Sequence, residues 1–220
     1  MRGAMKWAAA GLVLFLGSGC VSSAVEQTNP KTYAKERPPK AEADRKKVAV
    51  ADFEDKSGYG REQVGRPSAD ILNTVLVDCE QFAVYERQQL SKALDELKLG
   101  QSGAIDPTTA ARAGKMIGVD YVFYGVISKV GFRVEGTNVI LYQEKKQVAE
   151  ITVDCRMVHC ETGRIVFAKQ GDGLAKRTAT GSLGMGGRMS YDSGLFADAL
   201  RAAIYKMLDE MIDKAERAGQ

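Results

Sequence analysis

Histidine, tryptophan and cysteine are scarce in this chain of 220 residues, which contains one histidine, one tryptophan and four cysteines. No motif places a nucleophile and an orienting acid beside the single histidine, His159, so a histidine-based catalytic triad is not indicated. A zinc site built from His159, Cys155 and Cys160 is not indicated either, because three ligands within six residues do not match zinc-finger spacings. We therefore predict no catalytic residue and no metal site.

Phosphate-binding loops are also missing. The glycine-rich stretch from Gly181 to Gly187 could offer bare amides to an anion, but it lacks the Gly-Lys-Ser/Thr ending and the strand-to-helix context of a P-loop. A surface loop is the better interpretation. With no cofactor loop, metal cluster or nucleophile motif, we expect no cofactor and no enzymatic activity, which leaves a binding or assembly role.

A large excess of charge of one sign is absent. The whole chain has a formal net charge of +3, but residues 1–20 hold two basic and no acidic residues, which leaves 29 basic and 28 acidic residues in the rest. No run of aromatic residues alternates with Lys or Arg to suggest a base-stacking surface. We therefore exclude nucleic acid as a partner.

What is present begins with the layout of a signal peptide. Arg2 and Lys6 precede an uncharged stretch, Trp7 to Leu16, and three small residues, Gly17-Ser18-Gly19, stand directly before Cys20. The apolar stretch is far shorter than the roughly 20 residues of a membrane-crossing helix. We predict that residues 1–20 form a signal region cleaved before Cys20, whose thiol then carries acyl chains such as palmitate, as in bacterial lipoproteins.

The residues around the cleavage site also bear on location. Gly17 stands where a lipobox commonly has Leu, with Leu16 one place early, so an ordinary cleaved signal is the alternative. Acyl chains bind a membrane with about 0.8 kcal/mol per buried methylene. Val21 follows the cysteine, and in enteric bacteria a residue other than Asp there favours the outer membrane. We predict a protein at the periplasmic face of the outer membrane, with the membrane as its partner through the lipid anchor.

The rest of the chain divides into a tether and one domain. Residues 21–46 are polar and contain three of the five prolines, so they cannot bury enough apolar area to order themselves. We interpret them as a flexible periplasmic tether. Residues 47–217, about 170 residues, are the size of one domain with one core.

Apolar periodicity predicts the order of elements in this domain. Strands are expected at 47–53 and 82–85, and β-rich segments at 119–132, 151–158 and 164–169 should form antiparallel hairpins. Helical spacing predicts four helices. The first starts at Pro67 and has Cys79 on its apolar stripe, and the second covers Leu90–Leu97. The third is capped by Asp106 and ended by Gly118, and the last is a long helix over 196–215. The predicted fold class is α/β (α+β), a mixed sheet packed with three to four helices.

Three cysteines remain after Cys20. On an extended strand Cys155 and Cys160 point to opposite faces about 16 Å apart, at about 3.3 Å per residue, so they cannot bridge each other there. Buried free thiols are one expectation. The alternative, in an oxidising compartment, is a bond from Cys79 to one of the other two.

Four blocks together resemble the CsgG family, the curli production assembly/transport component. They are KKVAVADFEDKSG, SADILNTVLV, FAVYERQQLSKALDELKLGQSGAIDPTTAARAGKMIGVDYVFYG and ITVDCRMVHCETGRIVFA, and they span nearly the whole predicted domain. The resemblance implies a lipoprotein whose periplasmic domain assembles into a homo-oligomeric ring and whose two inserted hairpins join a common outer-membrane β-barrel pore. Relatives with the same core make no pore, among them lipoprotein activators of peptidoglycan synthases.

Two stretches are candidates for the inserted hairpins. In the stretch from Val130 to Val148, apolar and polar residues alternate at first, Gly136 to Asn138 interrupt the strand, and Gln143 to Gln147 form a charged turn. The stretch from Thr178 to Gly194 contains five glycines, so it is poor barrel material and could be a loop.

Two functions follow. The first is a ring-forming conduit that exports a secreted fibre subunit or related surface product, with Glu54 to Gly65 and Val130 to Val148 shaping the channel. The second is a tethered periplasmic module, without a pore, that binds and regulates or scaffolds a cell-envelope protein.

Overall fold

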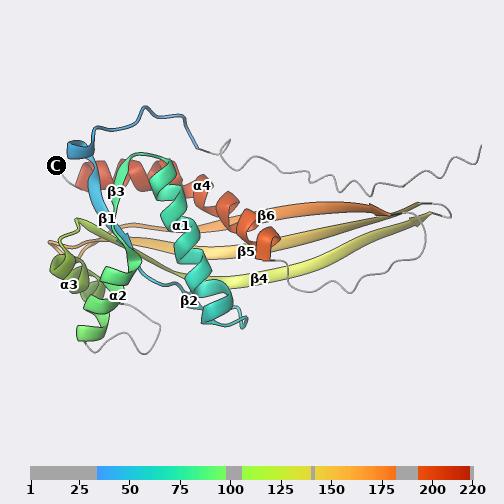
Figure 1. Cartoon of the computed structure of the whole chain (residues 1–220), viewed down its shortest axis with the longest axis horizontal. Coiled ribbons are helices and arrows are strands. Elements are labelled where there is room, and N and C mark those ends of the chain that lie inside the picture. Colours follow the sequence, from blue (N-terminus) through green and yellow to red (C-terminus); the bar gives the residue numbers. More distant parts are fainter. Residues whose placement is uncertain (1–33, 98–105, 140–141, 182–192, 219–220) are drawn as a thin grey trace, which may run out of the picture.

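The computed structural model describes residues 34–97, 106–139, 142–181 and 193–218, and within them a six-stranded mixed sheet packs with four α-helices (Figure 1). The strands are β1 (Lys46–Val50), β2 (Glu54–Asp55), β3 (Phe82–Val84), β4 (Tyr121–Val139), β5 (Tyr142–His159) and β6 (Ile165–Gly181). The helices are α1 (Arg66–Asp78), α2 (Arg87–Glu96), α3 (Pro107–Ile117) and α4 (Ser193–Ala218), with short turns η2 (Glu42–Asp44) and η3 (Arg61–Gly65). The predicted fold class is confirmed.

The sheet has a parallel half and an antiparallel half. Its strand order is β3-β1-β4-β5-β6, and β2 pairs with β4 beside this path. Strand β1 runs parallel to both β3 and β4, because α1 connects β1 to β3 and the α2–α3 pair connects β3 to β4. Strands β4, β5 and β6 follow one another as antiparallel hairpins, as the sequence predicts.

Two apolar cores lie on opposite faces of the sheet. Alternation along β1 shows the division, since Val48 and Val50 belong to the core beneath α1 and α4, whereas Ala49 belongs to the core beneath α2 and α3. Cys155 is buried in the first core and Cys160 in the second, so the prediction that they point to opposite faces is confirmed. A bond between them would have to cross the sheet.

Local signals in the sequence set the ends of α3. The Asp106 carboxylate accepts hydrogen bonds from the amides of Thr108 and Thr109, and Gly118 ends the helix with a φ of 75°. Both were predicted from the residue types. Helix α1 includes Pro67 in its first turn and ends at Asp78, and Cys79 follows as its C-cap and packs against the same core as the apolar stripe of the helix.

Three strands continue well beyond the helices as a narrow extension (Figure 1). We call this extension the ribbon, formed by residues 129–139 of β4, 142–152 of β5 and 172–181 of β6.

The predicted interruption at Gly136 to Asn138 is wrong, because Gly136 pairs with Lys145 and Asn138 with Gln143. The predicted turn at Gln143 to Gln147 is wrong for the same reason. Strand β5 is bonded on both sides, and backbone ladders tolerate polar side chains that face water.

One extra residue in β4 sets the faces of the ribbon. Ile127 pairs with Val153 and Lys129 with Thr152, so Ser128 has no opposite residue and forms a β-bulge. Side chains alternate along a strand, so the extra residue changes which residues of β4 face α1 and α4. Before the bulge these are the odd-numbered residues, and after it they are the even-numbered ones. Val130 and Phe132 therefore continue the apolar face of Ile127.

Helix α4 lies directly on β6, and two glycines permit the close approach. A Cβ atom at Gly171 would lie 2.8 Å from Met207 Cε. At Gly173 it would overlap the Ala199 carbonyl oxygen and lie 2.7 Å from the carbonyl carbon. The base of the ribbon is therefore fixed to α4 by backbone contact. None of the helices in the described ranges is long and apolar enough to cross a membrane.

Candidate functional site

The ribbon presents strand edges on both of its sides. Among the described residues, no strand pairs with the outer edge of β6, and none pairs with the outer edge of β4 beyond the β2 contact at Val126 and Ile127. Strand edges carry N–H and C=O groups that can pair with another chain. The ribbon can therefore accept one strand on the β4 side and another on the β6 side.

One face of the ribbon is apolar only near its base. Val130 and Phe132 of β4, Ile151 of β5 and Ala175 of β6 pack with the core beneath α1 and α4. The ring of Tyr59 contacts Phe132 edge-on, with ring centroids 6.0 Å apart. Further out, Val134 is half exposed and its row continues with Gln147 and Arg177. The apolar row of β4 thus spans about half of the 9–11 residues that a lipid-facing strand needs.

The opposite face of the ribbon carries paired charges. Arg133 bonds to Glu135 at 2.8 Å and also to Glu150, and Lys129 lies 3.4 Å from Glu150. Hydrogen bonds from Arg133 hold the pKa of Glu135 and of Glu150 below their ordinary values. At the base, the Thr152 hydroxyl donates to Asp172 at 2.7 Å. Mutually satisfied charges of this kind suit a face in contact with water.

The loop after β1 supports the base of the ribbon. Residues Glu54 and Asp55 pair with Val126 and Ile127 of β4. The Asp55 carboxylate then accepts hydrogen bonds from the Ser57 amide at 2.8 Å, the Ser57 hydroxyl at 2.6 Å and the Gly60 amide at 2.5 Å. Burial alone would raise the pKa of Asp55, but these hydrogen bonds bring it below its ordinary value. The contact of Tyr59 with Phe132 joins the two segments that were expected to shape a channel.

The structure places the histidine and cysteines in structural roles. The His159 ring contacts Tyr121 edge-on, with centroids 5.1 Å apart, and its Nδ1 lies 3.3 Å from the Thr162 amide. Cys79, Cys155 and Cys160 are free thiols, so the alternative of a disulfide from Cys79 is not formed. Burial raises the pKa of Cys155 and of Cys160 to about 12. No three potential ligands gather for a metal within the described part of the chain.

A contact that the sequence analysis did not find joins the N-terminal segment to α4. We call residues 34–40 the strap. Arg37 bonds to Asp213 at 2.8 Å and to Asp209 at 3.3 Å, and Lys40 bonds to Glu216 at 2.6 Å. These residues belong to the segment interpreted as a tether. The three acidic residues recur at helical spacing along α4, but nothing in the sequence indicates that the polar segment with Lys35, Arg37 and Lys40 lies against them.

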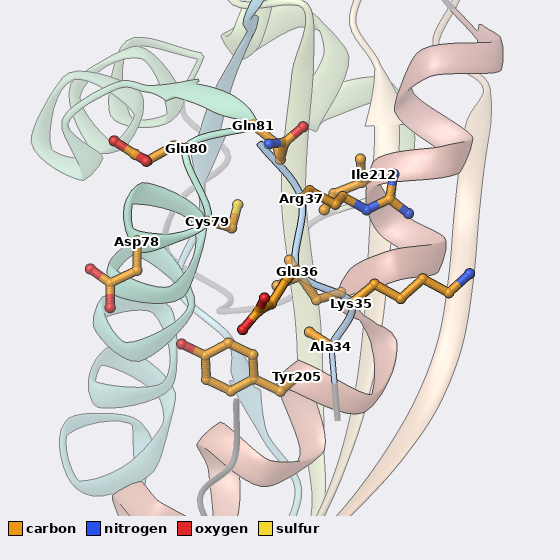
Figure 2. Close-up of a pocket in the computed structure, with 11 residues that line it drawn as sticks. Ala34, Lys35, Glu36, Arg37, Asp78, Cys79, Glu80, Gln81, Tyr205 and Ile212 are labelled. Carbon is orange, nitrogen blue, oxygen red and sulfur yellow. The ribbon is translucent and has the colours of Figure 1, made fainter. Parts of the chain in front are cut away.

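A pocket of 390 Å³ opens between the strap, α4 and the end of α1 (Figure 2). Its lining includes Tyr205, Leu208 and Ile212 from α4 and the half-buried Cys79. The strap is also held at the far side of this pocket, where the Lys40 amide donates to the Glu80 carbonyl at 3.2 Å and the Gln81 side chain donates to the Pro38 carbonyl at 2.9 Å.

The predicted lipidation site Cys20, most of the glycine-rich stretch at 181–187 and most of the second hairpin candidate, Thr178 to Gly194, lie outside the described residues. The signal region 1–20 lies outside them too, as does the first half of the predicted tether. The boundaries of the predicted segments stay predictions.

Comparisons with known proteins give a family match over most of the chain. The family model described as "Curli production assembly/transport component CsgG" matches residues 27–219. A protein of Neisseria meningitidis serogroup B that is described as a lipoprotein is 27% identical over 179 residues, which cover 77% of this chain and 76% of that protein.

Solved structures resemble the fold at low sequence identity. The LpoB C-terminal domain from Escherichia coli is 18% identical with a TM-score of 0.42, over 65% of this chain and 93% of that domain. Lipoprotein GNA1162 from Neisseria meningitidis is 11% identical with a TM-score of 0.43, over 80% of this chain and 99% of that one.

Proposed function

Because the chain belongs to the CsgG family, we propose that it is an outer-membrane lipoprotein that assembles with copies of itself and takes part in curli-type export. In this proposal Cys20 carries the lipid, the domain lies in the periplasm, and the exported molecule is a secreted fibre subunit or a related surface product. The protein acts as a passive conduit and catalyses no reaction.

The observation that carries the proposal is the ribbon with an open edge on each side. The β4 edge of one copy and the β6 edge of the next differ, so pairing between them is head-to-tail. Head-to-tail contacts close into a ring when the rotation between copies allows it. Residues 129–139 of β4 and 172–181 of β6 supply edges of similar length, so the ladder between copies can extend along the whole ribbon.

A paired set of proline variants tests this edge contact. Successive backbone N–H groups of a strand point to opposite sides, so Ala175 and Lys176 differ in where their N–H points. One of the variants Ala175→Pro and Lys176→Pro therefore removes an N–H group at the open edge of β6, and the other removes a hydrogen bond to β5. The variant that keeps the native melting temperature has lost only an outward group. We expect the lipidated wild type, extracted in detergent, to form a large oligomer that conducts ions in planar bilayers. The folded proline variant should be smaller and should not conduct.

A second function is favoured by the short apolar row and the charged face of the ribbon. Both suit a ribbon in water, where an open edge binds a strand of a cell-envelope partner protein. In that case the lipidated wild type should be a monomer or dimer that never conducts. Membrane association should be the same for both functions, and Cys20→Ser should abolish it.

A further inference from the structure

The strap runs parallel to α4. Its contacts advance in step along the helix, since the Lys35 amide donates to Asp209 at 3.0 Å, Arg37 reaches Asp213 and Lys40 reaches Glu216. The N-terminal end of the strap, Ala34, therefore lies toward the N-terminal end of α4, and Lys40 lies toward its C-terminal end.

The N-terminal end of α4 lies toward the ribbon. Glu210 bonds to Lys169 at 2.7 Å, whereas Ala199, further toward the start of the helix, lies against Gly173. Moving backward along α4 therefore means moving outward along β6, as Figure 1 also shows. The N-terminal end of the strap is therefore the end that lies nearer to the ribbon.

Chain lengths fit this direction. The start of the strap lies beside Asp209 of α4, which is level with Lys169 of β6. From Lys169 to the end of β6 at Gly181 the strand advances twelve residues, which extend about 41 Å at about 3.4 Å each. The fourteen residues from Cys20 to Ala34 can span at most about 46–50 Å. If the strap were released up to Lys46, the limit would rise to about 86–94 Å. Docking therefore cuts the reach to about the length of the ribbon.

We propose that the strap is a latch on the acidic row of α4, formed by Asp209, Asp213 and Glu216, that holds the ribbon toward the membrane in which the chain is anchored. The orientation rests on the proposed lipid anchor at Cys20, whereas the docking of the strap does not. With the latch closed, the anchor and the ribbon end meet at one membrane surface. With the latch open, the domain can turn away on a tether nearly twice as long.

Charge reversal of Arg37 opens the latch with little effect on the apolar cores, because Arg37 belongs to neither core and its ion pairs are with Asp209 and Asp213 of α4. The matched control is Arg112→Glu, which makes the same charge change at an exposed position of α3. The double variant Arg37→Glu with Asp213→Arg restores one pair with inverted charges.

Hydrogen exchange of the full chain in detergent measures the docking itself. Residues 34–40 should exchange about tenfold faster in Arg37→Glu than in the wild type, because the strap spends more time undocked. Arg112→Glu should match the wild type, and the double variant should recover at least part of the protection. Equal exchange in Arg37→Glu and the wild type would overturn the latch.

Energy transfer in vesicles measures the orientation. The only tryptophan, Trp7, lies in the predicted signal region, so the mature chain has none. A tryptophan is introduced at Val134 on the ribbon or at Met116 on α3, both about half exposed. The lipidated protein is reconstituted in phosphatidylethanolamine and phosphatidylglycerol vesicles that contain a dansyl-labelled lipid.

With the latch closed, Val134→Trp should transfer about twofold more energy to the dansyl lipid than Met116→Trp, because the anchor cannot reach far past the ribbon. Adding Arg37→Glu should bring the two values together, and the double variant should separate them again. A protein that floats with the vesicles but shows equal transfer from both positions overturns the orientation alone. A protein that does not float overturns the proposed anchor and the orientation with it, while the exchange experiment still decides the docking.

Discussion

The contact of Gly173 with α4 allows a sharp test of how the ribbon is fixed to the domain. A methyl group at this position would overlap the Ala199 carbonyl oxygen and lie 3.1 Å from the Ala203 amide nitrogen. These are backbone atoms of a helix, so they cannot move aside as a side chain could. In Gly173→Ala the start of α4 must therefore move away from β6.

The cost can be estimated from known overpacking effects. Extra methylenes in a packed core destabilise by about 1–3 kcal/mol, and a backbone clash belongs at the upper end. Alanine in place of glycine in a strand recovers about 0.5–1 kcal/mol. We expect Gly173→Ala to lower the free energy of unfolding by about 2–2.5 kcal/mol, and the melting temperature by about 4–10 °C for a domain of this size.

Gly131→Ala is the matched control on the same ribbon. Its new Cβ would meet only Glu150 Cβ, at 3.9 Å, which is ordinary contact. We expect its stability to stay within about 0.5 kcal/mol of the wild type. Circular dichroism melts of the two variants in detergent compare them directly, and equal melting temperatures would refute the close approach of α4 to β6.

Three further outcomes follow from the described contacts. Tyr121→Phe removes the buried hydrogen bond from the Tyr121 hydroxyl to the Ala215 carbonyl, 2.9 Å long, and urea titration should show a loss of about 1–1.5 kcal/mol. In a thiol-labelling time course at pH 8, Cys155 and Cys160 should react only on unfolding, because a pKa of about 12 leaves roughly one thiol in ten thousand ionised. Labelling of either cysteine at the rate of Cys79 would contradict this. Because the hydrogen bond from Arg37 lowers the pKa of Asp213 below its ordinary value of 3.8, the strap contact is fully present above that pH and weakens as the pH falls through the lower folded-state pKa. Exchange of residues 34–40, corrected for intrinsic rates, should rise in that acid range, and a flat profile would count against the pair.

The order of the elements could be predicted from the sequence because local signals and tertiary structure agree there. Asp106 and Gly118 stop α3 at both ends by their own chemistry, and strict alternation along β5 fixes which residues point inward. The faces of Cys155 and Cys160 follow from the same alternation and needed no tertiary information.

The length of the ribbon could not be predicted, because its outer part has the residues of a turn. Gly136 and the polar run from Gln143 to Gln147 lack the apolar alternation of a half-buried strand. They are extended because β5 is paired on both sides over these residues. The strap was missed for a related reason. Its polar composition predicts a free tether, and only the three-dimensional position of Asp209, Asp213 and Glu216 gives it a partner.

The bulge at Ser128 sets which residues of β4 lie on each face of the ribbon. Deletion of Ser128 alone would restore a regular ladder, with Ile127 still opposite Val153 and Lys129 still opposite Thr152, and would keep every later side chain of β4 on its present face. Deletion of Ser128 together with Lys129 would turn every later side chain of β4 to the other face. Arg133 would then point toward the side of α4, and Phe132 toward the charged neighbours of Glu150. A contact made through the strand edges would survive both deletions, whereas a contact made through a face would survive only the first, so the pair of deletions distinguishes the two ways in which the ribbon can bind.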